Sequence, residues 1–66
     1  MAKNQFDLTQ RQRDVLLLLR LGKTNDEIAK ELEISVNTVK THLKSLYIKL
    51  EVSNRTQATF KGNAIL

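Results

Sequence analysis

Ile34 to Leu50 reads ISVNTVKTHLKSLYIKL and contains no acidic residue, although the whole chain has seven. If this stretch is helical, at about 100° per residue, its side chains divide into two faces. The inner face is apolar and comprises Val36, Val39, Leu43, Leu46, Tyr47 and Leu50. The outer face comprises Asn37, Lys40, Thr41, Lys44, Ser45 and Ile48. The stretch therefore predicts one long helix, about residues 36–50, that is buried on one side and polar on the other.

The outer face suits a polyanion, in particular a DNA groove. Lys40 and Lys44 are one turn apart, so both ammonium groups can reach guanine O6 and N7 or flanking phosphates. Thr41, at the centre of this face, can offer its methyl group to thymine and its hydroxyl to a base edge or a phosphate. Asn37 can pair with adenine or bind a phosphate, and the sequence leaves both open. Ile48 is the apolar exception, either a partner contact or an ordinary exposed side chain.

The composition limits the fold to a single small helical domain. Sixty-six residues allow one core, and 41% hydrophobic but only 5% aromatic content favours an all-α bundle of Leu, Ile and Val. The chain has no cysteine and one histidine, so we expect no disulfide, no metal and no cofactor. A net charge of +4 favours an acidic partner, without distinguishing DNA from a ribosomal or membrane-surface role.

The sequence argues against two classes of protein, membrane-spanning proteins and enzymes. The longest apolar run, 15–19, is too short to span a membrane, and Met1 is not followed by a secretory signal, so a cytoplasmic protein is expected. No glycine-rich phosphate loop is present, and no nucleophile or carboxylate stands near His42 on its helix. A binding module is therefore expected, and not an enzyme.

Capping signals predict two helices before the long one, after a flexible segment at residues 1–7. Thr9-Gln-Arg-Gln12 is a capping box for a helix over 10–21, with Gly22 as its left-handed end. Thr24-Asn-Asp-Glu27 is a second box, for a helix over 25–32.

The connection to the long helix is short, and Ser35 is placed to cap that helix. Two helices joined by three or four residues, the second polar on its outer side, are typical of a helix-turn-helix. The long helix, roughly 22 Å in length, can enter a major groove at one end while the other end stays in the core. A last helix is predicted from Arg55, capped by Asn54 or Ser53, to about Lys61, because the tail after it has no clear period.

These residues resemble the LuxR/GerE-type helix-turn-helix, the output domain of NarL-like response regulators and quorum-sensing regulators. The resemblance covers residues 8–60 and is carried by Leu8-Thr9-x-Arg11, Val15-Leu16, Gly22, Asn25-x-Glu27-Ile28-Ala29, Leu32-x-Ile34-Ser35, Thr38-Val39-Lys40-x-His42-Leu43, Lys49-Leu50-x-Val52 and Arg55-x-x-Ala58. Two positions depart from the pattern: Glu51 stands where many members have glycine, and Gln12 where many have glutamate. The tail after Ala58 resembles the family poorly.

The resemblance implies a four-helix domain over 8–66 that regulates transcription from inverted-repeat DNA sites. Its partners would be double-stranded DNA and a second copy of the chain on that DNA, with RNA polymerase as a further candidate. Base-facing positions of the family fall here on Lys40, Thr41 and Lys44, in agreement with the outer face. The last helix would supply the dimer contacts Thr56, Ala58 and Thr59.

A further set of residues is expected to contact DNA phosphates: Thr24, Asn25, Ser35, Thr38, His42 and Arg55. The first four begin helices, where plain capping is an equally good explanation. His42 either packs only or also touches a phosphate, and Arg55 either binds a phosphate or ties the last helix to a carboxylate. The alternative from another class is a helical protein-interaction module, docking to a sigma factor or an acidic partner, which should enlarge the apolar patch around Ile48.

Overall fold

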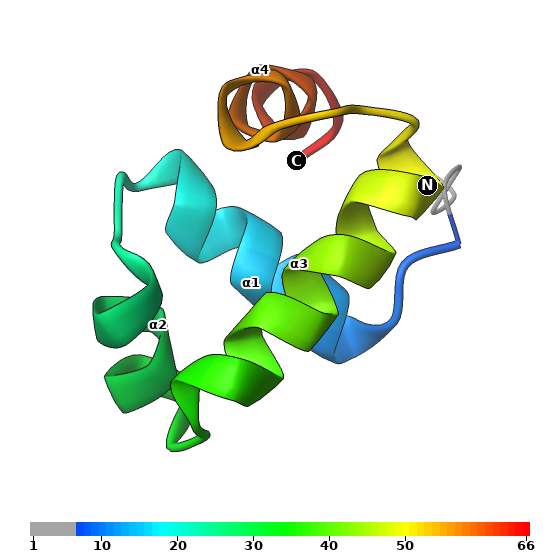
Figure 1. The fold of residues 1–66 in the computed structure, drawn as a ribbon. Coiled ribbons are helices and arrows are strands. Elements are labelled where there is room, and N and C mark those ends of the chain that lie inside the picture. Colours follow the sequence, from blue (N-terminus) through cyan, green and yellow to red (C-terminus); the bar gives the residue numbers. More distant parts are fainter. Residues whose placement is uncertain (1–6) are drawn as a thin grey trace.

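The computed structural model describes residues 7–66 and contains four helices and no strand in that range (Figure 1). They are α1 (Gln10–Arg20), α2 (Asn25–Leu32), α3 (Val36–Leu50) and α4 (Arg55–Ile65). The predicted all-α class and the bounds of α2 and α3 are confirmed, and α1 ends one residue earlier than predicted. The flexible segment expected at 1–7 lies outside the described residues, except for Asp7.

The predicted caps start the helices. In α1 the Thr9 hydroxyl accepts from the Gln12 N–H at 3.1 Å, and Gln12 Oε1 accepts from the Thr9 N–H at 2.9 Å. The second box at the start of α2 is formed in the same way. In α4 the Asn54 side chain accepts from the Gln57 N–H at 2.9 Å, but Gln57 Oε1 accepts from the Ser53 N–H at 2.7 Å. Asn54 is therefore the cap, and the reciprocal side-chain bond reaches one residue further back, to Ser53.

Three helices end in left-handed residues, of which only one is glycine. Gly22 after α1 has φ 81°, whereas Glu33 after α2 and Glu51 after α3 have φ 57° and 59°. A residue with a Cβ adopts this conformation at a cost of roughly 1–2 kcal/mol. Glu51, which replaces the glycine of many similar sequences, therefore makes the same turn under strain.

The core lies where α1, α3 and α4 meet, with α2 packed against α3 (Figure 1). Val15, Leu16, Ile28, Val39, Leu46, Leu50 and Ala58 have no exposed surface. These residues come from all four helices, so the apolar inner face of α3 forms the centre of one shared core. No helix in the described part of the chain has the length and apolarity needed to cross a membrane.

The predicted end of α4 at about Lys61 is wrong, because the helix continues to Ile65. Gly62 is buried where α4 crosses α1, and a Cβ added there would lie 2.8 Å from Cδ1 of Leu16. Asn63 Oδ1 accepts a hydrogen bond from Nε of Arg20 at 2.9 Å, and Ile65 packs against the core. Contacts with α1 thus sustain the last turn of α4, although its own sequence has no helical period.

Candidate nucleic-acid interface

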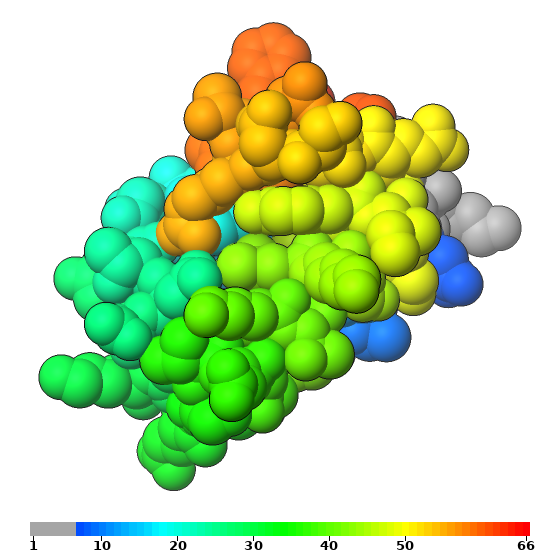
Figure 2. Space-filling view, viewed as in Figure 1, coloured from blue at the N-terminus to red at the C-terminus, as the bar shows by residue number. Residues whose placement is uncertain are grey.

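The outer face of α3 is open to solvent as predicted. Asn37, Lys40, Thr41 and Lys44 are all exposed. In Figure 2 the atoms of α3 occupy the middle of one side of the molecule, between α2 and α4, so neither neighbour covers this face. It presents two ammonium groups, an amide and a hydroxyl, and no acidic group of α3 accompanies them.

The polar groups of this face retain capacity for a ligand. Among residues 7–66, no hydrogen bond or ion pair engages the ammonium group of Lys40 or Lys44. The Thr41 hydroxyl donates to the Asn37 carbonyl at 3.1 Å, so its hydrogen is used within the helix while its lone pairs and methyl group remain. Two cations, one amide and one hydroxyl acceptor can therefore contact a base edge or a phosphate.

The inner face of α3 is held in place by packing and by a hydrogen bond to α1. Ser45, predicted on the outer polar face, is instead half-buried and accepts from Nε2 of Gln12 at 2.9 Å. Gln12 is only 5% exposed, so Ser45 satisfies a buried amide. The prediction for Ser45 failed because it lies at the border between the two faces, where the position of α1 decides its environment.

Lysines fix the C-terminal end of α3. Lys49 Nζ donates to the Asp7 carbonyl at 2.8 Å, so this residue at the edge of the expected flexible segment is anchored. Lys61 Nζ of α4 donates to the Leu50 carbonyl at 2.8 Å, which places a cation at the negative end of the α3 macrodipole. The outer face is thus carried by a helix fixed along its length.

Two of the expected phosphate contacts at the helix starts, Thr24 and Ser35, cap their helices. Ser35 Oγ accepts from the Thr38 N–H at 3.0 Å and lies 2.9 Å from Oγ1 of Thr38. Thr24 accepts from the Glu27 N–H, and the Glu27 carboxylate accepts from the Thr24 N–H at 2.8 Å. This backbone hydrogen bond lowers the pKa of Glu27 from its ordinary value. Both hydroxyls of the Ser35–Thr38 pair remain exposed and can accept further hydrogen bonds.

Arg55 ties α4 to the start of α2. Its guanidinium donates to Oδ1 of Asn25 at 3.0 Å and to the Lys23 carbonyl. Arg55 was expected to bind either a phosphate or a carboxylate; within the domain its acceptors are instead a side-chain amide oxygen and a backbone carbonyl oxygen. Arg55 and Asn25 are both half-buried, and they satisfy one another before any phosphate is bound.

The two remaining residues singled out on α3 have different environments. His42 is half-buried on the flank of the helix, whereas Ile48 is 71% exposed on the outer face. No hydrogen bond within the described range fixes the His42 ring. His42 is thus placed beside the outer face, and Ile48 is part of it.

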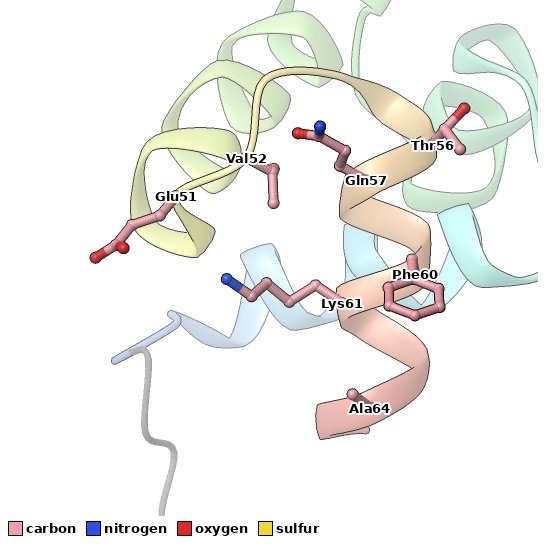
Figure 3. Close-up of a pocket in the computed structure, with 7 residues that line it drawn as sticks. All are labelled: Glu51, Val52, Thr56, Gln57, Phe60, Lys61 and Ala64. Carbon is pink, nitrogen blue, oxygen red and sulfur yellow. The ribbon is translucent and has the colours of Figure 1, made fainter.

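The three expected dimer contacts on α4 differ in their exposure to solvent. Ala58 has no exposed surface and belongs to the core, so it offers nothing to a partner, whereas Thr56 is exposed and Thr59 half-buried. Phe60 was not among the expected contacts, and it is 79% exposed and projects beside a hollow of about 550 Å³ (Figure 3). A signal was present in the sequence, because Phe60 and Ala64 are one turn apart on the same side of α4.

Comparison with known proteins identifies the domain. Residues 7–61 match the family described as bacterial regulatory proteins, luxR family. The chain is 54% identical over 56 residues to the CsgBAC operon transcriptional regulatory protein of Escherichia coli, which covers 85% of the chain and 26% of that protein. It is 53% identical over 51 residues to the transcriptional regulatory protein LiaR of Bacillus subtilis, covering 77% of the chain and 24% of that protein.

A third relative, the HTH-type transcriptional regulator MalT of Yersinia pestis, is 44% identical over 59 residues, which is 89% of the chain and 6% of that protein. The chain therefore spans about a quarter of the first two relatives and much less of the third. The family is one of DNA-binding regulators, which confirms the expectation of a binding module and not an enzyme. The four helices, the exposed cationic face and these matches together mean that the chain belongs to the luxR family and is a helix-turn-helix DNA-binding domain of a transcriptional regulator.

Proposed function

We propose that the domain binds DNA sequence-specifically, with the outer face of α3 in the major groove. The observation that carries the proposal is the exposure of Asn37, Lys40, Thr41 and Lys44 on the acid-free side of a helix whose other side is buried. An α-helix fits the major groove, where lysine recognises guanine and asparagine recognises adenine. Chromosomal DNA as the ligand also implies action in the cytoplasm.

The proposed contacts fall into two groups with different effects. Asn37, Lys40, Thr41 and Lys44 contact base edges, so they set the preferred sequence. Ser35 and Thr38, whose exposed hydroxyls lie together at the start of α3, contact phosphate along with Thr24 and His42. Asn25 and Arg55 bind phosphate only through the hydrogen-bonding capacity left after their mutual contact. We therefore expect the first group to change specificity and the second to change affinity for all sequences.

The test begins by selecting bound duplexes from a random pool and measuring band shifts with the preferred site. Lys40→Ala and Lys44→Ala should each weaken binding to that site by about 1–3 kcal/mol. Lys30→Ala is the matched control, because it removes an exposed lysine from α2 and should bind nearly as the wild type does. Wild-type affinity for both α3 variants would contradict the proposal and favour the protein-interaction alternative.

We further propose that two copies bind inverted half-sites through α4. The exposed ring of Phe60 lines two hollows. Val52 and Ala64 also line the first (Figure 3), and Thr56 and Thr59 also line the second. A ring beside an apolar hollow is self-complementary, as a two-fold interface requires. Thr56 and Thr59 remain the proposed contacts, and Phe60 takes the place of Ala58.

The dimer is tested by sedimentation with duplexes that carry one or two half-sites. Two copies of the wild type should bind the two-site duplex more tightly than two independent binding events predict. Phe60→Ser should lose that cooperativity. Leu17→Ser is the control, because it replaces another exposed apolar residue, on α1. Equal cooperativity in all three proteins would exclude α4 as the dimer contact.

A further inference from the structure

Ile48 is the residue of the α3 outer face to which the proposed interface gives no role. Its side chain is 71% exposed, although its neighbours Lys44 and Thr41 on the same face are polar. An aliphatic side chain cannot bind a phosphate or donate to a base. Any contribution of Ile48 to DNA binding is therefore an apolar contact.

Helix geometry places Ile48 on the same line as the proposed base contacts. Ile48 is seven positions after Thr41, which is about 700° of rotation, or within about 20° of two full turns, and about 10 Å of rise. Ile48 also lies one turn beyond Lys44. Ile48 is therefore the next exposed side chain along the line of Asn37, Thr41 and Lys44.

The position of the Ile48 side chain is fixed by its surroundings. Leu46 and Leu50 on either side have no exposed surface, and Lys49 is held by the Asp7 carbonyl at 2.8 Å. Rotating α3 to bury Ile48 would expose these leucines. Two branches at Cβ also restrict χ1, so the aliphatic group is presented to solvent in few conformations.

We infer that Ile48 is a specificity-determining residue that contacts the C5-methyl group of one thymine in each half-site. In the major groove this methyl group is the base feature that an apolar side chain recognises. The inference rests on the proposed function, because it requires the outer face of α3 to lie in the groove. It adds a thymine preference beyond the positions contacted by Lys40, Thr41 and Lys44.

The experiment removes the methyl group from the DNA and the aliphatic group from the protein. In the preferred duplex, each thymine is replaced in turn by deoxyuridine, which differs only in lacking the methyl group. For the wild type, replacement at one position of a half-site should weaken binding about fourfold for each methyl group removed, the effect of roughly 0.8 kcal/mol for one buried methyl-sized group. Ile48→Ala should bind the unmodified duplex more weakly by a similar or larger factor and show no further loss at that position.

Two controls separate this inference from the proposed function. Leu17→Ala, which truncates an exposed leucine of α1 away from the line, should keep the wild-type response to deoxyuridine. If no thymine couples to Ile48→Ala, or the preferred site holds no thymine, while Lys44→Ala still weakens binding, this inference alone is overturned. If Lys40→Ala and Lys44→Ala also bind as the wild type does, the proposed function is overturned, and this inference with it.

Discussion

The two faces of α3 share one backbone and have opposite surroundings. On the inner face, Val39, Leu43, Leu46 and Leu50 are at most 6% exposed. On the outer face, Asn37, Lys40, Thr41 and Lys44 are all exposed. The fold and the proposed recognition therefore depend on different side chains of one helix. Substitutions on one face should therefore change stability, and those on the other should change binding.

The largest effect is expected on the inner face. Leu46→Ala should lower the free energy of unfolding by about 2–5 kcal/mol, because it leaves a cavity at a residue with no exposed surface. In a domain of this size such a loss is a large part of the total stability. Urea unfolding followed by circular dichroism measures it, and a loss below about 1 kcal/mol would mean that the core tolerates a cavity at Leu46.

On the outer face, a substitution should weaken DNA binding and leave stability nearly unchanged. Lys44→Glu should weaken binding to the preferred duplex by about 3 kcal/mol, or roughly a hundredfold, because a cationic contact is lost and a repulsive charge is added. The free energy of unfolding should change by less than about 0.5 kcal/mol, since Lys44 is exposed. A variant that lost stability together with binding would contradict the separation of the two faces.

Ser45 lies at the border between the two faces of α3. Ser45→Ala should cost about 1–2 kcal/mol of stability, because Nε2 of the buried Gln12 loses its acceptor. Thr41→Ala is the matched control on the same helix, since its hydroxyl is exposed and bonds only to the Asn37 carbonyl. Equal stability of the two variants would show that the contact between Gln12 and Ser45 contributes nothing.

A smaller gain of stability is expected where α3 ends. Glu51→Gly should stabilise the domain by about 0.5–1 kcal/mol, because glycine adopts φ 59° without the strain that a Cβ introduces. Glu51→Ala removes the charge but keeps the Cβ, and it should give no such gain. A gain with alanine as large as with glycine would assign the effect to charge and not to conformation.

The smallest effect is expected at the exposed start of α2. Because the pKa of Glu27 is lowered in the folded state, its carboxylate contributes stability above its unfolded-state pKa. That contribution should disappear as the pH falls below about 4.5 and through the lowered folded-state pKa. Glu27→Gln should show a shallower loss of stability in this range than the wild type. Identical pH profiles would mean that ionisation of Glu27 contributes nothing to stability.

Local signals explain why the first three helices could be predicted from the sequence. The caps at Thr9, Thr24 and Ser35 act over three residues, and the apolar period of α3 specifies its buried side without reference to other helices. The exposed positions Lys40, Thr41 and Lys44 follow from that period alone.

The features that could not be predicted depend on residues far apart in the chain. The last turn of α4 needs Gly62 against Leu16, and the environment of Ser45 needs Gln12, 33 residues away. Nothing within α4 indicated that Ala58 would be fully buried, because that depends on how α4 packs against the other helices. Helix caps and apolar periods determine where individual helices lie in the sequence. The end of α4 and the burial of Ser45 and Ala58 are determined by packing between helices.

The proposal that DNA binds the outer face of α3 can be tested by amide chemical-shift mapping. The domain is labelled with nitrogen-15 and titrated with the selected duplex, with a scrambled duplex of the same length as the control. The largest sequence-dependent shifts should fall on residues 37–48 of α3, and Lys44→Glu should abolish them. Unshifted amides in that range, with the largest shifts on the exposed side of α1 or α2, would contradict the claim.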